Sequence, residues 1–319
     1  MNAIYLDAGR VSLKRLPRPA RPEGFALIRL VCGGICNTDL ELQRGYYGFK
    51  GVPGHEFVGE VVEAESTDLI GRRVVGEINL ACGNCEWCAR DLGRHCPKRT
   101  VLGIVKHPGA FRELLTLPEK NLHVVPDSLP SEHAVFTEPV AAACEILDQV
   151  RIRKGAHVAV LGDGKLGLLI SQVLNAYGAR VHQFGRHRAK LRIAEKVGVT
   201  TELARKKMPV ARYAWVVEAT GSAEGLRTAV QMTRPRGTLI MKSTVHGLAR
   251  IDTAPMVVNE ITLVGSRCGR FEPAITLLKA GRLNVADMIH DRFQLLDGPK
   301  AFRRAAQKGV LKVLLTSGS

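Results

Sequence analysis

Residues 158–167 read VAVLGDGKLG, and this stretch indicates the architecture of the second half of the chain. A short apolar run, Val158–Leu161, leads into three glycines with the spacing G-x-G-x-x-G, at Gly162, Gly164 and Gly167. A helix-length periodic segment follows directly. A strand that turns on glycines into a helix forms a cradle for phosphate, because the free N–H groups and positive dipole end of the helix face the anion. The stretch therefore predicts a dinucleotide-binding strand–turn–helix unit.

The three glycines have separate expected roles in this turn. Gly162 allows the tight turn, Gly164 lets the backbone approach a pyrophosphate, and Gly167 allows close packing of helix on strand. The predicted cofactor contacts here are Gly162, Gly164, Lys165, Leu166 and Gly167, with Thr220 at the end of a later predicted strand.

From about Lys154 onward, short apolar runs alternate with helix-length segments, a pattern typical of parallel strands joined by crossover helices. The predicted strands are His157–Leu161, Arg180–Phe184, Trp215–Ala219, Thr238–Met241 and Thr262–Val264. The predicted helices are Lys165–Tyr177, Arg188–Val197 and Ala223–Thr233. Gly178 and Gly198 follow the first two helices, as helix stop signals do. We therefore predict a doubly wound parallel sheet.

The end of the second strand of this sheet carries no acid, since residues 184–190 read FGRHRAK. An acid there would bind the ribose 2′-hydroxyl of NAD. Gly185 leaves room instead, and Arg186, Arg188 and Lys190 can neutralise a 2′-phosphate, with Arg186 the best bidentate partner. The alternative is a solvated basic helix start, although positive charge there opposes the helix dipole and needs compensation. The segment predicts NADP in preference to NAD.

The first hundred residues have a different sequence pattern, rich in glycine and proline and in short runs of residues that favour β-strands. Ala26–Val31, Phe57–Val62 and Arg73–Val75 are predicted strands, separated by turn signals such as Pro53-Gly54 and Gly71. This part of the chain is expected to form an irregular β domain.

Four of the eight cysteines fall within fifteen positions, with two, two and seven residues between them. They are Cys82, Cys85, Cys88 and Cys96. Four thiolates complete the tetrahedral shell of a structural zinc. An iron–sulfur cluster or free buried thiols are the alternatives, and the long last gap disfavours iron–sulfur. Clustered cysteines of this kind are typical of metal ligands in a cytosolic protein.

The formal net charge of +16 raises the question of a nucleic-acid partner. The basic residues are spread along the chain, and no basic tract is interleaved with aromatic residues that would stack on bases. No signal-peptide pattern is visible, and no apolar run approaches the roughly 20 residues that span a bilayer. We expect a cytoplasmic protein with no nucleic-acid or membrane partner, whose charge attracts a phosphorylated cofactor.

Several motifs occur in the order seen in medium-chain zinc-dependent alcohol dehydrogenases, a family that the chain resembles over nearly its whole length. They are Gly34-Ile35-Cys36-Asn37-Thr38-Asp39, Gly54-His55-Glu56, the cysteine cluster, Glu138-Pro139 and the glycine turn. The resemblance implies an α/β protein with a GroES-like β domain at 1–135, completed by about 270–319, and a Rossmann dinucleotide domain at 136–269. Dimers and tetramers are both common among such proteins, so a homodimer or homotetramer is expected. The segment between Gly198 and Trp215 is shorter than in the family, where a longer strand and helix are usual.

The resemblance also implies a second, catalytic zinc, which gives two per chain. Cys36 and His55 correspond to its first two ligands. The third is a carboxylate, either Glu138, which we place slightly ahead, or Glu56; this resembles the polyol, sugar and threonine dehydrogenase branches. Glu138 has an alternative role at the start of a helix, where acids are favoured. Asp39 is placed to orient a ligand histidine.

The implied reaction is hydride transfer between an alcohol of the polyol, sugar or amino-alcohol type and NADP, giving an aldehyde or ketone. Zinc in an open site stabilises the alkoxide, and Thr38, two residues after Cys36, is placed to accept the alcohol proton. Leu40 and Glu41 stand where some relatives have a histidine, so an outer proton relay is not specified. The alternatives are a carbonyl reductase on the same scaffold and a non-catalytic cofactor-binding protein, which the set Cys36, His55 and Glu138 disfavours.

Overall fold

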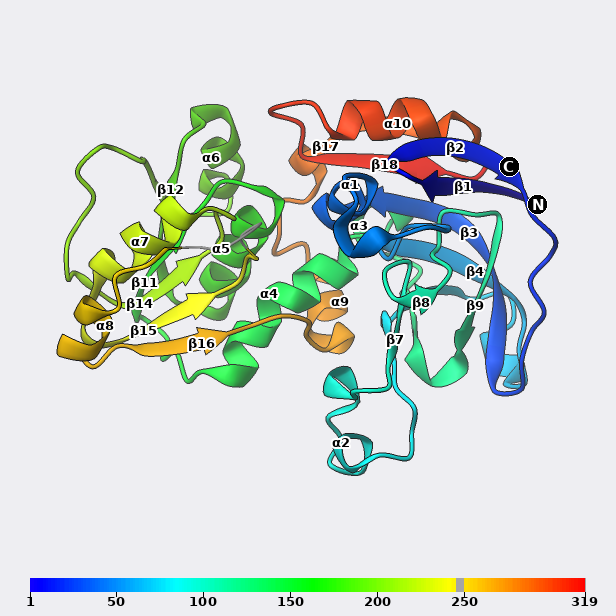
Figure 1. Cartoon of the computed structure of the whole chain (residues 1–319), viewed down its shortest axis with the longest axis horizontal. Helices are drawn as coiled ribbons and strands as arrows, with labels where there is room; N and C mark the ends of the chain where they lie inside the picture. Colours follow the sequence, from blue (N-terminus) through cyan, green and yellow to red (C-terminus); the bar gives the residue numbers. More distant parts are fainter. Residues whose placement is uncertain (245–249, 319) are drawn as a thin grey trace. The chain divides into compact units, whose positions relative to one another are not determined.

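The computed structural model describes residues 1–244 and 250–318. The chain folds into two compact units, which Figure 1 colours along the sequence. Unit 1 comprises Met1–Glu138 and Ile289–Ser319, and unit 2 comprises Pro139–Met288. The α/β class and the pairing of a GroES-like unit with a dinucleotide-binding unit, both expected from the sequence, are confirmed.

Unit 1 is built on a seven-stranded sheet in the order β10-β5-β4-β3-β18-β17, with β9 pairing with β3. The strands are β3 (Phe25–Ile35), β4 (Phe57–Glu63), β5 (Arg73–Gly76), β9 (Leu114–Pro118), β10 (Leu122–Val124), β17 (Ile289–Gln294) and β18 (Lys312–Thr316). The C-terminal strand β18, red in Figure 1, lies beside the blue β3, antiparallel from Val313 opposite Ile35 to Thr316 opposite Cys32. The residues just before Cys36 are therefore held between two strands from opposite ends of the chain.

Smaller elements complete unit 1. They are the hairpin β1 (Asn2–Asp7) and β2 (Arg10–Arg15), the small sheet β6 (Asn79–Leu80), β7 (Thr100–Leu102) and β8 (Lys106–His107), and the helices α1 (Asn37–Gln43), α2 (Glu86–Ala89), α3 (Ser131–Ala134) and α10 (Gly298–Ala305). The loop that carries α2 runs from β6 to β7 and contains the cysteine cluster.

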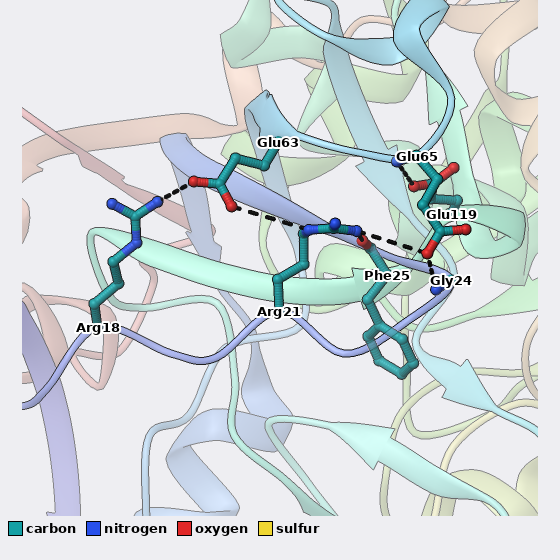
Figure 2. A network of polar contacts seen from close by, with 7 residues as sticks. All are labelled: Arg18, Arg21, Gly24, Phe25, Glu63, Glu65 and Glu119. Carbon is teal, nitrogen blue, oxygen red and sulfur yellow. Dashed lines mark hydrogen bonds and ion pairs between the residues drawn. The ribbon is translucent and has the colours of Figure 1, made fainter.

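Surface ion pairs connect the segment between β2 and β3, residues 16–24, to other parts of unit 1 (Figure 2). Arg18 pairs with Glu63, whose other oxygen lies 3.9 Å from Arg21 Nε. Arg21 Nη1 lies 3.8 Å from Glu65 Oε1 and donates to the Phe25 carbonyl at 3.0 Å. Exposed pairs of this kind contribute roughly 0–1 kcal/mol each, so they direct the path of the segment more than they stabilise the fold.

Unit 2 is a six-stranded parallel sheet in the order β13-β12-β11-β14-β15-β16. Its strands are β11 (His157–Leu161), β12 (Arg180–Gly185), β13 (Thr200–Leu203), β14 (Tyr213–Glu218), β15 (Thr233–Met241) and β16 (Thr262–Gly265). Its helices are α4 (Thr137–Gln149), whose first two residues belong to unit 1, α5 (Lys165–Tyr177), α6 (Arg188–Glu195), α7 (Ala223–Met232), α8 (Ala254–Val258) and α9 (Phe271–Lys279). The strand order reverses between β11 and β14, and ligands of such sheets bind at the carboxyl ends of the strands at this point.

The predicted strands and helices of this sheet are confirmed, most of them within two residues at each end. β13 runs on to β14 without a helix in residues 204–212, as the short segment before Trp215 predicted. None of the helices in the described ranges combines the length and apolar character needed to cross a lipid bilayer.

The tail differs from the sequence expectation in one helix. We expected residues from about 270 onward to return to the first domain, but α9 belongs to unit 2 and the chain re-enters unit 1 only at Ile289. The reason is contact with α4: a Cβ on Gly269 would lie 1.9 Å from the Ala141 carbonyl oxygen, and Arg270 Nη2 lies 3.0 Å from Asp148 Oδ1. The strand expected near Leu311–Leu315 does lie in unit 1, as β18.

Candidate active site

The four clustered cysteines converge in the loop from β6 to β7. Their Sγ atoms lie within 4.8 Å of one another, with separations of 3.5 Å for Cys85–Cys88, 3.7 Å for Cys85–Cys96, 3.5 Å for Cys82–Cys96 and 4.0 Å for Cys82–Cys88. Four sulfurs at about 2.3 Å from a tetrahedral zinc would be about 3.8 Å apart, so the spacing fits this ion. The Cys82 backbone bonds to the Cys96 thiol and lowers its pKa to about 6, which favours the thiolate that a metal requires.

A second group of ligand atoms forms where β3 ends. Cys36 is the N-cap of α1, and its backbone N–H donates to Asp39 Oδ2 at 2.8 Å, so the start of the helix fixes the direction of the thiol. Thr38 Oγ1 lies 3.9 Å from Cys36 Sγ. The loop before β4 supplies His55 and Glu56, which are 3% and 1% exposed.

Asp39 joins the two segments that carry these ligands. Its Oδ1 accepts the Gly54 N–H at 3.2 Å and lies 3.4 Å from His55 Nδ1. Burial lowers the pKa of His55, but attraction by the Asp39 carboxylate and contact with Cys36 raise it by more. The pKa of His55 therefore lies well above its ordinary value. A fully buried carboxylate thus lies on the Nδ1 side of the imidazole and attracts it, although the Nδ1 atom makes no hydrogen bond with a described residue.

Glu56 is held by a lysine from the other end of the chain. Lys312, 1% exposed, pairs with Glu56 Oε2, and its Nζ lies 5.4 Å from the centroid of the Phe136 ring. Burial lowers the pKa of Lys312, but attraction by the Glu56 carboxylate outweighs this and leaves the pKa raised. A Cβ on Gly34 would lie 2.7 Å from Glu56 Oε2, so glycine leaves the space that the carboxylate fills.

The remaining oxygen, Glu56 Oε1, is buried and has no hydrogen-bond partner in the described part of the chain. One ligand atom from each of Cys36, His55 and Glu56 lies within 4.8 Å of the others. A thiolate, an imidazole and a carboxylate form a zinc ligand set of the open type, and a buried carboxylate oxygen without a hydrogen-bond donor is available to bind a cation. The donor set therefore fits a zinc ion.

Glu138 is the carboxylate that the sequence places slightly ahead of Glu56 as the third ligand of the catalytic zinc. The group of ligand atoms within 4.8 Å, among the residues described, contains Glu56 and not Glu138. Glu138 lies in the first turn of α4, where an acid is also favoured by the helix dipole. Sequence reasoning missed Lys312, because a lysine in a C-terminal strand gives no local signal of a buried partner.

The glycine turn of unit 2 follows the expected geometry. Gly162 has φ +120°, and a Cβ there would lie 2.4 Å from the Ala219 carbonyl oxygen. A Cβ on Gly167 would lie 2.4 Å from the Gly162 carbonyl oxygen, whereas Gly164, the N-cap of α5, has open space at its Cβ position. Thr220 follows β14 beside this turn, with its backbone N–H and hydroxyl bonded to Glu218 Oε1 at 2.6 and 2.5 Å. The open face at Gly164 fits a pyrophosphate on the start of α5, which includes Lys165 and Leu166.

The cationic residues after β12 have unequal surroundings. Arg186 is exposed and makes no hydrogen bond or ion pair with a described residue. Arg188 lies 2.8 Å from Glu195 and donates to the Thr201 hydroxyl at 3.2 Å, so it is partly neutralised by its own helix. Lys190 lies in the first turn of α6 and is half-buried. Of the predicted 2′-phosphate contacts, Arg186 is therefore the guanidinium left available.

Comparison with known proteins identifies both units. Residues 22–127 match the alcohol dehydrogenase GroES-like domain, and residues 166–280 match the zinc-binding dehydrogenase domain. The chain is 30% identical over 317 residues to D-altritol 5-dehydrogenase of Agrobacterium fabrum, covering 92% of this chain and 93% of the relative. It is also 30% identical over 309 residues to L-threonine 3-dehydrogenase of Coxiella burnetii, covering 90% and 89%.

Solved structures agree with these relatives. A zinc-binding dehydrogenase of Sinorhizobium meliloti 1021 bound to NADP has a TM-score of 0.90 at 28% identity, covering 99% of this chain and 98% of the other. An alcohol dehydrogenase from Thermus sp. ATN1 has a TM-score of 0.87 at 29% identity over all of both chains. These matches show that the chain belongs to the medium-chain zinc-dependent alcohol dehydrogenase family and is an oxidoreductase of that type.

Proposed function

We propose that the protein transfers hydride between a polyol-type or amino alcohol and NADP, with a catalytic zinc on Cys36, His55 and Glu56. The observation that carries the proposal is the buried Glu56 Oε1, which lacks a donor beside a thiolate and an imidazole. Relatives named for D-altritol, sorbitol and L-threonine oxidation support a substrate with neighbouring hydroxyl or amino groups. The reverse reaction, reduction of the matching carbonyl, uses the same site.

The residues of the chain have distinct parts in this reaction. When bound, zinc supplies a Lewis acid for the substrate oxygen and NADP supplies the hydride acceptor. The Thr38 hydroxyl, 3.9 Å from the Cys36 sulfur, accepts the alcohol proton as it releases its own, so that one proton passes on toward bulk solvent. Asp39 attracts the Nδ1 side of His55, and Lys312 balances the charge of Glu56 so that two anionic ligands are tolerated in a buried site.

We further propose two zinc ions per chain and a preference for NADP over NAD. The sulfur spacing of the Cys82–Cys96 cluster supports the structural zinc. The unpaired cation of Arg186, just after β12, supports a 2′-phosphate, as does the NADP bound in the Sinorhizobium structure. Gly185, which we expected to leave room for the phosphate, leaves room for the Asp163 side chain instead.

A homo-oligomer is proposed from the edge of the unit 2 sheet. β16 is the last strand of its sheet, and Leu263 on it is 50% exposed. Val257 and Val258 on the neighbouring α8 are 75% and 79% exposed. A second copy pairing along β16 would cover both the unpaired edge and these valines, giving a homodimer that is also the building block of a homotetramer. Light scattering that returns a monomer mass at micromolar concentration would reject this assembly.

The decisive experiment is a panel of polyols and amino alcohols assayed with NADP⁺ and NAD⁺ by the absorbance of the reduced nicotinamide. The Cys36→Ser variant should lose turnover and one of two zincs while it still binds NADP⁺. The matched control is Cys268→Ser, because Cys268 belongs to neither ligand group. Retained turnover in Cys36→Ser, or loss of cofactor binding together with turnover, would reject the proposed catalytic site.

A further inference from the structure

Asp163, the middle residue of the glycine turn, reaches out of that turn to the end of the neighbouring strand. Its Oδ2 accepts the backbone N–H of His187 at 2.6 Å and lies 3.0 Å from the His187 ring Nδ1. The Asp163 side chain is 11% exposed. A carboxylate from the turn after β11 is therefore fixed at the turn after β12.

This position is the one that the strand-end acid of an NAD site would need. Gly185 is the last residue of β12, where an acid ordinarily binds the ribose 2′-hydroxyl. A Cβ on Gly185 would lie 2.5 Å from Asp163 Cβ and 2.8 Å from Asp163 Oδ2. Only glycine at 185 leaves room for the Asp163 carboxylate, so the acid that is missing from the strand end is supplied from the glycine turn.

The two oxygens of Asp163 differ in their surroundings. Oδ2 contacts both the backbone N–H and the ring of His187, whereas Oδ1 accepts no hydrogen bond from a described residue. The first turn of α6 contains no acid, so the Oδ2 contact also supplies the negative charge that this cationic helix start needs. Oδ1 remains as an acceptor beside Gly185.

We propose that Asp163 is a specificity-determining residue that limits the preference for NADP. Its carboxylate accepts the ribose 2′-hydroxyl of NAD and repels the 2′-phosphate of NADP, while Arg186, across the same turn, attracts the phosphate. The selectivity of the site is then a balance between one carboxylate and one guanidinium. The inference rests on the proposed function in one respect, namely that the dinucleotide lies along the glycine turn.

The test is a binding measurement on the zinc-loaded protein without substrate. Dissociation constants for NADP⁺ and NAD⁺ are measured by calorimetry for the wild type, Asp163→Asn and Arg186→Ala. Asp163→Asn, which keeps the size of the side chain and removes its charge, should raise the preference for NADP⁺ by about tenfold, since a charge at contact distance has effects of this size. Arg186→Ala should lower the preference. Glu224→Gln, which removes an exposed charge on α7 in the same unit, is the control and should leave the ratio unchanged.

An unchanged ratio in Asp163→Asn, a shift toward NAD⁺, or equal weakening of both cofactors would each overturn the proposal, because Asp163 would then only brace the two turns. Competition by 2′,5′-ADP and by 5′-ADP separates the 2′-phosphate from the rest of the cofactor: only the 2′,5′-ADP affinity should rise in Asp163→Asn. The wild-type ratio tests the proposed NADP preference, and the change on substitution tests Asp163, so the two can fail separately.

Discussion

At the scale of single residues, the Glu56–Lys312 pair is the feature with the largest expected effect on stability. Both side chains are buried, and removal of one charge leaves the other without compensation. Lys312→Met should therefore lower the free energy of unfolding by about 3–5 kcal/mol. The double variant Glu56→Gln/Lys312→Met should recover part of this loss, because no unpaired charge remains. Urea unfolding of the wild type, Glu56→Gln, Lys312→Met and the double variant measures the difference, and a double variant whose loss of stability equals the sum of the two single losses would contradict the pairing.

Gly34 permits a second prediction about the same carboxylate. A Cβ at this position would lie 2.7 Å from Glu56 Oε2 and 3.3 Å from Lys312 Cδ. Gly34→Ala should displace Glu56, lower the zinc content from two toward one, and cost about 1–3 kcal/mol by overpacking. Gly265→Ala is the matched control, because an added Cβ at the end of β16 meets no atom within 4 Å. Unaltered zinc content in Gly34→Ala would show that Glu56 does not help to hold the metal.

The residues of the site were predictable to different degrees. Cys36 and His55 stand in motifs whose order along the chain carries the family resemblance, and the structure brings their ligand atoms together. Lys312 is separated from Glu56 by 256 positions, and only the pairing of β18 with β3 makes them neighbours. No role for Asp163 is apparent from the sequence, because its partner His187 belongs to another loop.

At the scale of elements, the proposed structural zinc should have its clearest effect on the loop between β6 and β7 that contains the cysteine cluster. Its helix α2 has four residues, far fewer than the roughly 12–15 that an isolated helix needs in water. Trp87 on this helix is 40% exposed, so little apolar burial compensates. Cys85→Ser should remove one zinc, lower the melting temperature and open the loop to proteolysis between β6 and β7. Mass spectrometry of the first cleavage products is the measurement, and cleavage elsewhere at an unchanged rate would contradict a metal-dependent loop.

The elements with strong local signals were predicted well, and those shaped by distant contacts were not. β11 and α5 have the predicted bounds, because an apolar run, a glycine turn and Gly178 mark their ends. β3 continues to Ile35, beyond the predicted Val31, although Gly33 and Gly34 suggest a turn. A Cβ on Gly33 would lie 2.9 Å from the Phe111 ring, so these glycines stay in the strand and make room for side chains packed over it.

At the scale of the whole molecule, the sequence predicted two domains with the chain returning to the first. The return is later than expected, because contacts such as Arg270 with Asp148 keep α9 in unit 2. The residue at which the chain leaves unit 2 depends on contacts between segments far apart in the sequence, and no local sequence pattern indicates such contacts. The two groups of proposed zinc ligands belong to unit 1, whereas the glycine turn and Arg186 belong to unit 2.

This division predicts that metal and cofactor stabilise different units. NADP⁺ at 100 times its dissociation constant should stabilise unit 2 by about 2.7 kcal/mol, and a chelator should destabilise unit 1. Differential scanning calorimetry of the wild type and Arg186→Ala tests both effects: the variant should lose most of the NADP⁺-induced shift and keep the full response to the chelator. Because a ligand stabilises only the cooperative unit to which it binds, a single transition that both treatments move equally would mean that the two units unfold as one. If NADP⁺ raises the temperature of one transition and the chelator lowers the temperature of the other, the cofactor and the metal bind to different units. This result would not depend on the distances from which the two sites were proposed.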